Sequence, residues 1–228
     1  MKCVLVSNKA WVDNIAEACS GFIGATWVFL EDPSQLSIEK IRQIEPRYLF
    51  FPYWSRIVPK EIFENYECVM FHMTDLPFGR GGSPLQNLIV RGIYQTKITA
   101  FKCESGLDSG PVYLKRPLLL HGSAQEIYIR AGDIVKEMIR EIIVKDIKPQ
   151  PQVGEVTIFK RREPFQSEIP SGLGLQQIYD YIRMLDADGY PRAFIKVGGF
   201  KVEFSDAILE DGQVAASAKI VLDGEGCV

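Results

Sequence analysis

Short apolar runs of strand length alternate with amphipathic stretches of helix length through the first half of the chain. Runs that are apolar throughout are typical of strands buried on both faces of a sheet. Strand–helix alternation of this kind predicts an α/β fold with a doubly wound, Rossmann-like mixed sheet. The predicted strands cover residues 3–6, 25–30, 48–53 and 68–72, and the predicted helices between them cover residues 13–19 and 34–44.

The pattern changes after Lys148-Pro149-Gln150-Pro151, which predicts a domain boundary. Before it, residues 96–103 and 112–120 are β-rich, and residues 124–144 carry apolar side chains at helical spacing. We therefore expect a catalytic domain at 1–150 and a small helix-plus-β subdomain at 151–228. In the subdomain, the predicted elements are a helix at 174–185 and strands at 193–197, 201–204 and 218–221.

Composition excludes several classes of protein. The 228 residues are 46% hydrophobic and 24% charged, as in ordinary globular domains. A net charge of −3 gives no electrostatic basis for bulk nucleic-acid binding. The five cysteines are scattered without C-x-x-C spacing, which argues against a disulfide framework or a zinc site. With neither a signal peptide nor a membrane-length apolar stretch, the expected location is the cytoplasm.

The first predicted strand is followed by Ser7-Asn8-Lys9-Ala10, which is neither a dinucleotide-binding nor a phosphate-binding loop. His72 is more informative, because it ends the fourth predicted strand, where open α/β sheets place their ligands. The glycine-rich loop at 76–82 follows, and Ser83-Pro84 is typical of a helix start. Position alone leaves a catalytic role and a strand-end role for His72 equally open. His121, the other histidine, is interpreted as solvated or capping.

An aspartate bracketed by glycines follows a β-rich run, in the sequence Gly106-Leu107-Asp108-Ser109-Gly110. Such a loop can bring one carboxylate close to the histidine of another strand. A simple Asx turn between two strands explains the spacing equally well, and spacing alone favours the turn.

Together these segments resemble the folate-dependent formyltransferase family. Residues 72–86, H-M-T-D-L-P-F-G-R-G-G-S-P-L-Q, resemble the family's H-x-S-x-L-P-x-x-R-G-x-x-P-x-Q. Residues 106–110 resemble its G-x-D-[ST]-G, and Arg56-Ile57-Val58-Pro59 stands where the family has a pterin loop. The combination, in this order and spacing across residues 45–120, is specific, whereas each motif alone is weak.

The resemblance implies transfer of a formyl group from 10-formyltetrahydrofolate to an amine, without a metal. It makes His72 the general base and acid and Asp108 its partner. A histidine is suited to taking the proton of the attacking amine near neutral pH. The residues expected around the folate are Trp54, Arg56, Ile57, Val58, Gly106 and Leu107, and those expected around the acceptor are Asp75, Gly81, Gly82, Arg161 and Arg183.

Two positions depart from the family pattern. Met70 stands where the family has an asparagine that stabilises the oxyanion, and losing such a donor typically costs about 10²–10³ in rate. We expect a replacement donor, with Thr74 the first candidate and Asn87 or the amides of Gly81 and Gly82 the others. Asp75 either binds the ammonium group of the acceptor or caps its loop.

The segment at 178–194 resembles nucleotide-sugar N-formyltransferases, and the loop at 77–87 resembles those that act on a UDP-linked 4-amino sugar of the pseudaminic-acid type. The expected acceptor is therefore a nucleotide-linked amino sugar, with Arg183 as a diphosphate ligand or, alternatively, as a surface side chain over the core. Alternatives are formylation of methionyl-tRNA or of an amino acid bound to a peptide synthetase, a formyl-folate hydrolase, and a binding protein without catalysis. No nucleic-acid or membrane partner is expected. The resemblance makes a homodimer possible, and the sequence leaves the oligomeric state open.

Overall fold

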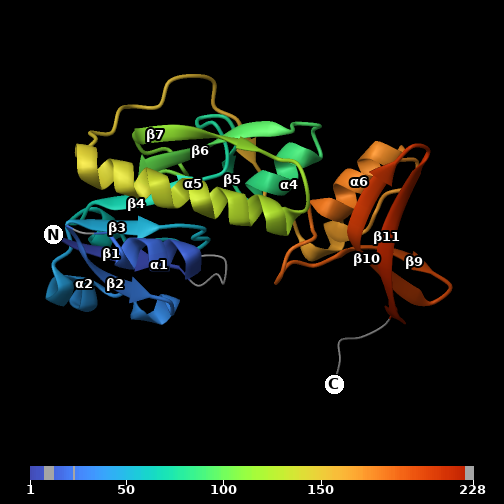
Figure 1. Cartoon of the computed structure of the whole chain (residues 1–228), viewed down its shortest axis with the longest axis horizontal. Helices are drawn as coiled ribbons and strands as arrows, with labels where there is room; N and C mark the ends of the chain where they lie inside the picture. The colour runs from blue at the N-terminus through green and yellow to red at the C-terminus, as the bar shows by residue number, and fades with distance from the viewer. Residues whose placement is uncertain (8–12, 23, 224–228) are drawn as a thin grey trace. The chain divides into compact units, whose positions relative to one another are not determined.

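The computed structural model describes residues 1–7, 13–22 and 24–223 (Figure 1). These residues divide into two compact units, which are considered separately. The first comprises residues 1–84, 95–118 and 128–159, and the second comprises residues 85–94, 119–127 and 160 onward. The predicted mixed α/β fold with a C-terminal helix-plus-β part is confirmed.

Six strands of the described residues form the sheet of the first unit, in the order β2-β1-β3-β4-β6-β7. β1 pairs in parallel with β2 and β3, β3 pairs in parallel with β4, and β4 pairs antiparallel with β6. The sheet is therefore mixed, with its parallel part on the N-terminal side. The strand bounds are β1 Lys2–Val6, β2 Thr26–Leu30, β3 Tyr48–Phe51, β4 Cys68–His72, β6 Gln95–Lys102 and β7 Val112–Leu119.

Alternate residues of the central strands supply the core on the two faces of the sheet. Val4, Leu49 and Phe51 pack in one cluster with Ile41 of α2 (Ile38–Ile44) and Ile62 of α3 (Lys60–Phe63). These helices therefore cover one face. The neighbouring residues along each strand point to the other face, as the period of two requires.

That other face carries α1 (Asp13–Ser20) and the long helix α5 (Ala124–Lys145), which runs along the sheet in Figure 1. The ring of Phe50 lies 5.9 Å from that of Trp27 on this side. Helices on both faces give the doubly wound arrangement that the sequence predicts. Among the described residues, no helix combines the length and the apolar character that crossing a membrane requires.

The predicted helix at 34–44 is only partly present. Asp32 accepts a hydrogen bond from the amide of Ser34 and starts a 3₁₀ turn at Pro33–Gln35. Ser37 then caps a separate helix, α2, by accepting from the amide of Lys40 at 3.2 Å. Two competing N-caps five residues apart explain the division, because each favours its own helix start.

In the second unit, the amphipathic helix α6 (Leu175–Arg183) packs on a three-stranded antiparallel sheet of order β11-β10-β9. A short helix, α4 (Pro84–Ile89), begins at the proline that the sequence singled out and continues into this unit. Strands β10 and β11 are longer than predicted, because their outer parts contain polar residues. The strand bounds are β9 Ala193–Val197, β10 Phe200–Glu210 and β11 Gln213–Leu222.

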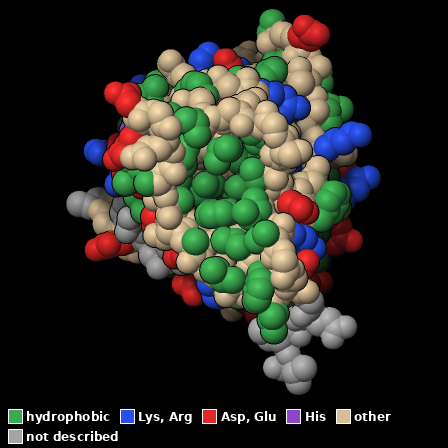
Figure 2. Space-filling model, turned by 90° about the vertical axis from the view of Figure 1, so that its right-hand side faces the viewer, with side chains coloured by type: hydrophobic (Ala, Val, Ile, Leu, Met, Phe, Trp, Pro, Cys, Tyr) green, Lys and Arg blue, Asp and Glu red, His purple; other side chains and the backbone are tan. Residues whose placement is uncertain are grey.

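One face of this C-terminal sheet is apolar and exposed. Val197, Phe200 and Leu222 are paired across the three strands and are 57%, 44% and 76% exposed. Ile195 and Ile220 lie one pleat further along on the same face, at 36% and 66% exposed. Figure 2 looks onto this part of the molecule and shows apolar side chains gathered at its centre. Exposed apolar patches of this kind are typical of interaction surfaces.

Candidate active site

His72 is the last residue of β4, at the carboxyl edge of the parallel strands. Open α/β sheets bind their ligands at this edge. The imidazole is buried, and its Nε2 lies 2.7 Å from the carbonyl oxygen of Gly79. Its Nδ1 lies 3.7 Å from Oδ2 of Asp108. The structure thus brings together the histidine and the aspartate that the sequence singled out.

Asp108 lies in the connection between β6 and β7, with a backbone φ of 45°. A residue other than glycine in this left-handed region typically costs about 1–3 kcal/mol, so surrounding contacts must hold it there. One such contact is the amide of Gly81, which donates to Oδ2 of Asp108 at 2.8 Å. The loop therefore connects two strands, as a simple turn does, and also presents its carboxylate to His72.

Gly81 belongs to a two-residue parallel ladder that the sequence does not predict, between β5 (Arg80–Gly81) and β8 (Ile158–Phe159). Its φ is 106°, and a Cβ atom here would lie 2.3 Å from the carbonyl oxygen of Phe159. Only glycine fits without moving the backbone. The ladder holds the Gly81 amide where it can meet the Asp108 carboxylate.

Asp75, expected at the acceptor, is already paired with two lysines. Its Oδ2 lies 2.8 Å from Nζ of Lys97, and its Oδ1 lies 2.5 Å from Nζ of Lys115. Burial opposes ionisation, but hydrogen bonds from Lys115 and Lys97 outweigh it and hold the pKa of this carboxyl below its usual value. Of the two interpretations of Asp75, the structure favours the loop-holding role, because protein cations occupy both carboxylate oxygens.

The candidate replacements for the missing oxyanion donor already donate within the protein. The Thr74 hydroxyl donates to the carbonyl oxygen of Gly79 at 3.3 Å, and the Asn87 amide donates to that of Lys160 at 2.9 Å. The single amide hydrogen of Gly81 goes to Asp108, and that of Gly82 goes to the carbonyl oxygen of Phe159 at 3.1 Å. A role for the Thr74 hydroxyl or for either glycine amide in oxyanion binding requires that the present bond be exchanged, whereas the Asn87 amide nitrogen carries two hydrogens.

The residues expected around the folate differ in what they can offer. Val58 is 3% exposed and packs in the core beside α2 and α3, so its side chain is not available to a ligand. Ile57 is 92% exposed and Leu107 is 62% exposed. Leu107 lies beside the position that a Cβ atom of Gly81 would take. Trp54 has a buried indole nitrogen without a hydrogen-bond partner among the described residues. An aromatic heterocycle fits the exposed apolar side chains of Ile57 and Leu107, whereas Trp54 packs against the same core cluster as Val58. Arg56 and Gly106 are exposed.

Arg183, which was expected to bind the diphosphate of the acceptor, has protein partners for its guanidinium group. Its side chain is 4% exposed and forms an ion pair with Asp180 at 2.6 Å. Its Nη1 donates to the carbonyl oxygens of Leu120 and Gly122 at 2.6 and 2.8 Å. These bonds make Arg183 a structural residue of the second unit. Arg161, in the same unit, is exposed.

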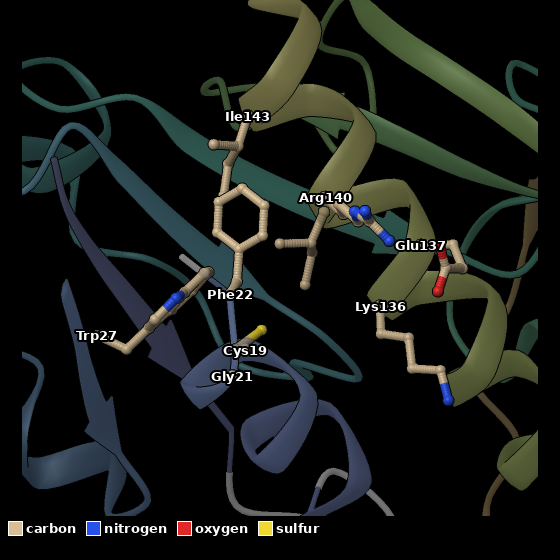
Figure 3. Close-up of a pocket in the computed structure, with 9 residues that line it drawn as sticks. Cys19, Gly21, Phe22, Trp27, Lys136, Glu137, Arg140 and Ile143 are labelled. Atoms are coloured by element: carbon tan, nitrogen blue, oxygen red, sulfur yellow. The ribbon is translucent and has the colours of Figure 1, made fainter. Parts of the chain in front are cut away.

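A cavity of about 410 Å³ lies in the first unit, between the end of α1 and the middle of α5 (Figure 3). Phe22, Trp27 and Ile143 give it apolar walls, and the charged side chains of Lys136 and Arg140 stand at one side. None of the residues of the three motifs lines it. The site around His72 is therefore defined by its side chains and backbone groups, and not by this cavity.

Comparison with known proteins decides the family. A structure described as methionyl-tRNA formyltransferase from Clostridium thermocellum is 48% identical in sequence, with a TM-score of 0.94, over 97% of this chain and 99% of that one. The chain belongs to the formyltransferase family. The family model for the C-terminal domain of methionyl-tRNA formyltransferase also matches, at residues 164–221.

More distant matches agree on the fold. The methionyl-tRNA formyltransferase of Thermodesulfovibrio yellowstonii is 25% identical over 154 residues, which are 64% of this chain and 50% of that protein. The chain thus spans about half to two thirds of the length of the curated relatives it matches. HypX from Aquifex aeolicus, solved in complex with tetrahydrofolic acid, is 18% identical with a TM-score of 0.75 over 91% of this chain and 38% of that one. A sugar N-formyltransferase from a Shewanella species and a 4-N formyltransferase from Francisella tularensis share the fold, at 16% and 12% identity and TM-scores of 0.68 and 0.65.

Proposed function

We propose that this chain transfers the formyl group of 10-formyltetrahydrofolate to a primary amine, and that the amine is the amino group of methionyl-tRNA. The observation that carries the chemistry is the placement of the His72 ring between the Asp108 carboxylate and the Gly79 carbonyl oxygen. The acceptor is inferred from the description of the relative that is 48% identical over nearly its full length. The formyl donor is inferred from the family, and the exposed apolar side chains of Ile57 and Leu107 are in keeping with it.

The geometry supports proton transfer by His72. The Gly79 carbonyl oxygen lies 2.7 Å from Nε2 and an Asp108 carboxylate oxygen lies 3.7 Å from Nδ1, so each ring nitrogen has an acceptor beside it. As the amine nitrogen bonds to the formyl carbon, the amine loses a proton and His72 accepts it. His72 then returns the proton to the folate nitrogen as the bond between that nitrogen and the formyl carbon breaks. Such transfer typically contributes about 10²–10⁴-fold.

A nucleotide-linked amino sugar is the second candidate acceptor. The observation in its favour is charge, because the chain has 26 basic and 29 acidic residues. Proteins that neutralise many phosphates of a nucleic acid use lysine and arginine for it, and their sequences are usually basic overall. A small acceptor needs no such excess.

The test is release of tetrahydrofolate from 10-formyltetrahydrofolate, measured with methionyl-tRNA, with UDP- and dTDP-linked amino sugars, and without an acceptor. Release that requires methionyl-tRNA is the expected result, and it should be about 10²–10⁴-fold slower in the His72→Asn variant. Release that requires an amino sugar would establish the second candidate. Release without an acceptor would indicate a hydrolase, and folate binding without any release would indicate a binding protein.

A further inference from the structure

Gln152 lies in an extended segment outside any helix or strand, six residues before β8. It is half-buried, and no motif in the sequence includes it. Its side chain nevertheless connects the two segments that carry the site. The partners lie 72 and 44 residues away along the chain, at Arg80 and Asp108.

The Gln152 amide uses its full hydrogen-bonding capacity. Its Oε1 accepts from Nε and Nη2 of Arg80 at 3.2 and 2.7 Å. Its Nε2 donates to the carbonyl oxygens of Asp108 and Gly110, both at 2.8 Å. A guanidinium only donates and a carbonyl only accepts, so the orientation of the amide is fixed by its partners.

These four bonds close a ring of contacts around the Asp108 carboxylate. Nε2 of Gln152 binds the backbone on both sides of Ser109, where the loop carries Asp108 at a positive φ. Oε1 binds the side chain of Arg80, whose neighbour Gly81 donates to Oδ2 of Asp108. The backbone of Asp108 and the donor to its carboxylate are therefore tied to one side chain.

Gly110 shows how little freedom the loop has on this side. A Cβ atom on Gly110 would lie 1.8 Å from the carbonyl oxygen of Lys102. The backbone of the loop thus packs directly on β6 at Gly110, whereas Asp108 itself is held by hydrogen bonds. Removing the Gln152 bonds leaves the strained φ of Asp108 with less to hold it.

We propose that Gln152 is a positioning residue for the reaction, which sets the distance and direction of the Asp108 carboxylate relative to His72. The proposal rests on the proposed function. It makes no claim that Gln152 contacts either substrate. Displacements of about 1 Å in a catalytic group can cost about 10²-fold in rate, so a side chain that fixes this geometry affects turnover without touching the reacting atoms.

The test compares Gln152→Met and Gln152→Glu with Gln150→Met, a matched control on the same segment. Gln150 is exposed, and its side chain reaches only the carbonyl oxygen of Lys148, at 3.5 Å. Methionine keeps the length of glutamine and removes all four bonds. Glutamate keeps the acceptor for Arg80 and removes both donors to the Asp108 loop. It therefore separates the bonds to Arg80 from the bonds to the loop.

We expect kcat to fall about 10–100-fold in both Gln152 variants, with the KM for 10-formyltetrahydrofolate changed less than about twofold. Gln150→Met is expected to behave like the wild type. An unchanged kcat in a folded Gln152 variant would overturn the proposal. Failure of both Gln152 variants to fold would also overturn it, because Gln152 would then be a structural residue.

A second readout does not depend on activity. The chain has only two histidines, so the imidazole Cε1–H resonance of His72 can be identified by NMR with a His121→Gln variant. At fixed pH, this resonance is expected to move in Gln152→Met and to stay in place in Gln150→Met. If the wild type transfers formyl to no acceptor, the proposed function fails, whereas a resonance that moves still supports the positioning role. A resonance that does not move contradicts that role directly.

Discussion

At the scale of single residues, the site combines one ionisable ring with two fixed acceptors. The Asp108 carboxylate faces Nδ1 of His72, and the Gly79 carbonyl oxygen faces Nε2. Both acceptors are held by other groups, Asp108 by the Gly81 amide and Gly79 by the Thr74 hydroxyl. The surroundings of the ring are therefore organised before any substrate arrives.

Replacing His72 with asparagine is expected to lower kcat by about 10²–10⁴-fold, because the proton must then pass through water. Asp108→Asn keeps the shape of the loop and removes the negative charge, so we expect a smaller loss. Steady-state kinetics of tetrahydrofolate release measures both, with circular dichroism to verify folding. Full turnover in either folded variant would show that the pair is not catalytic.

Asp75 connects pH to stability. Its carboxyl has a pKa below the ordinary value of 3.8, because of the hydrogen bonds from Lys115 and Lys97. A carboxyl with a lowered pKa in the folded state stabilises the fold above the unfolded-state pKa, and this contribution is lost as pH falls through the folded pKa. Urea titrations should therefore show that Asp75→Asn is less stable than the wild type at pH 7 and that the difference shrinks below about pH 4. A difference that is equal at pH 7 and pH 3 would contradict this.

At the scale of secondary-structure elements, the sequence predicts most of what is local. The strand at 68–72 is confirmed as Cys68–His72, and the helix at 124–144 as Ala124–Lys145. Short-range periodicity is sufficient for such elements. It is not sufficient for the two-residue ladder between β5 and β8, which joins residues nearly 80 positions apart and leaves no periodic pattern.

In the site, too, residues marked by local sequence could be predicted and residues held by distant partners could not. His72 and Asp108 could be found because the segments that carry them resemble the motifs of the family, whereas position alone left the role of His72 open and spacing alone favoured a simple turn at Asp108. Gln152 could not, since nothing near it in sequence marks its partners. The burial of Arg183 was not predicted, because a guanidinium group can bind a phosphate or a carboxylate equally well. The aspartate three residues before it, Asp180, is the signal that points to the buried ion pair.

The connection between β6 and β7 is expected to tolerate no side chain at Gly110. An added Cβ would meet the backbone oxygen of Lys102 at 1.8 Å, so Gly110→Ala should cost about 1–3 kcal/mol of unfolding free energy or more. Gly174→Ala is the control, because a Cβ at Gly174 would find its nearest contact at 3.8 Å. Thermal unfolding followed by circular dichroism measures both. Equal melting temperatures for the two variants would contradict the expectation.

At the scale of the whole molecule, the apolar face of the C-terminal sheet is a surface on which the homodimer left open by the sequence could form. Its residues Phe200, Ile220 and Leu222 are 44–76% exposed, although their side chains are large and aliphatic or aromatic. Covering such a surface removes apolar area from water, which is favourable by about 25 cal/mol of free energy for each Å². Association of two copies through this face would be isologous, the same surface meeting itself.

Light scattering coupled to size-exclusion chromatography is expected to give twice the mass of one chain. The double variant Ile220→Lys with Leu222→Glu should give the mass of one chain, because charges on this face oppose its burial. Lys219→Glu, which changes a charge on the opposite face of β11, is the control and should stay dimeric. A wild type that remains monomeric at high micromolar concentration would exclude the homodimer.

The ring of contacts around Asp108 also limits where two enzymes of this family can be joined in a chimera. The three motifs end near residue 110, yet the site is completed by Gln152 and by the carbonyl oxygen of Phe159, which binds the Gly82 amide. In a chimera of two such enzymes joined at the proline-rich segment 148–151, these groups would come from the parent that supplies the C-terminal part. A junction placed after Phe159 keeps these groups in the same parent as His72, so the residues from 160 onward could be exchanged while the contacts around His72 and Asp108 are inherited together.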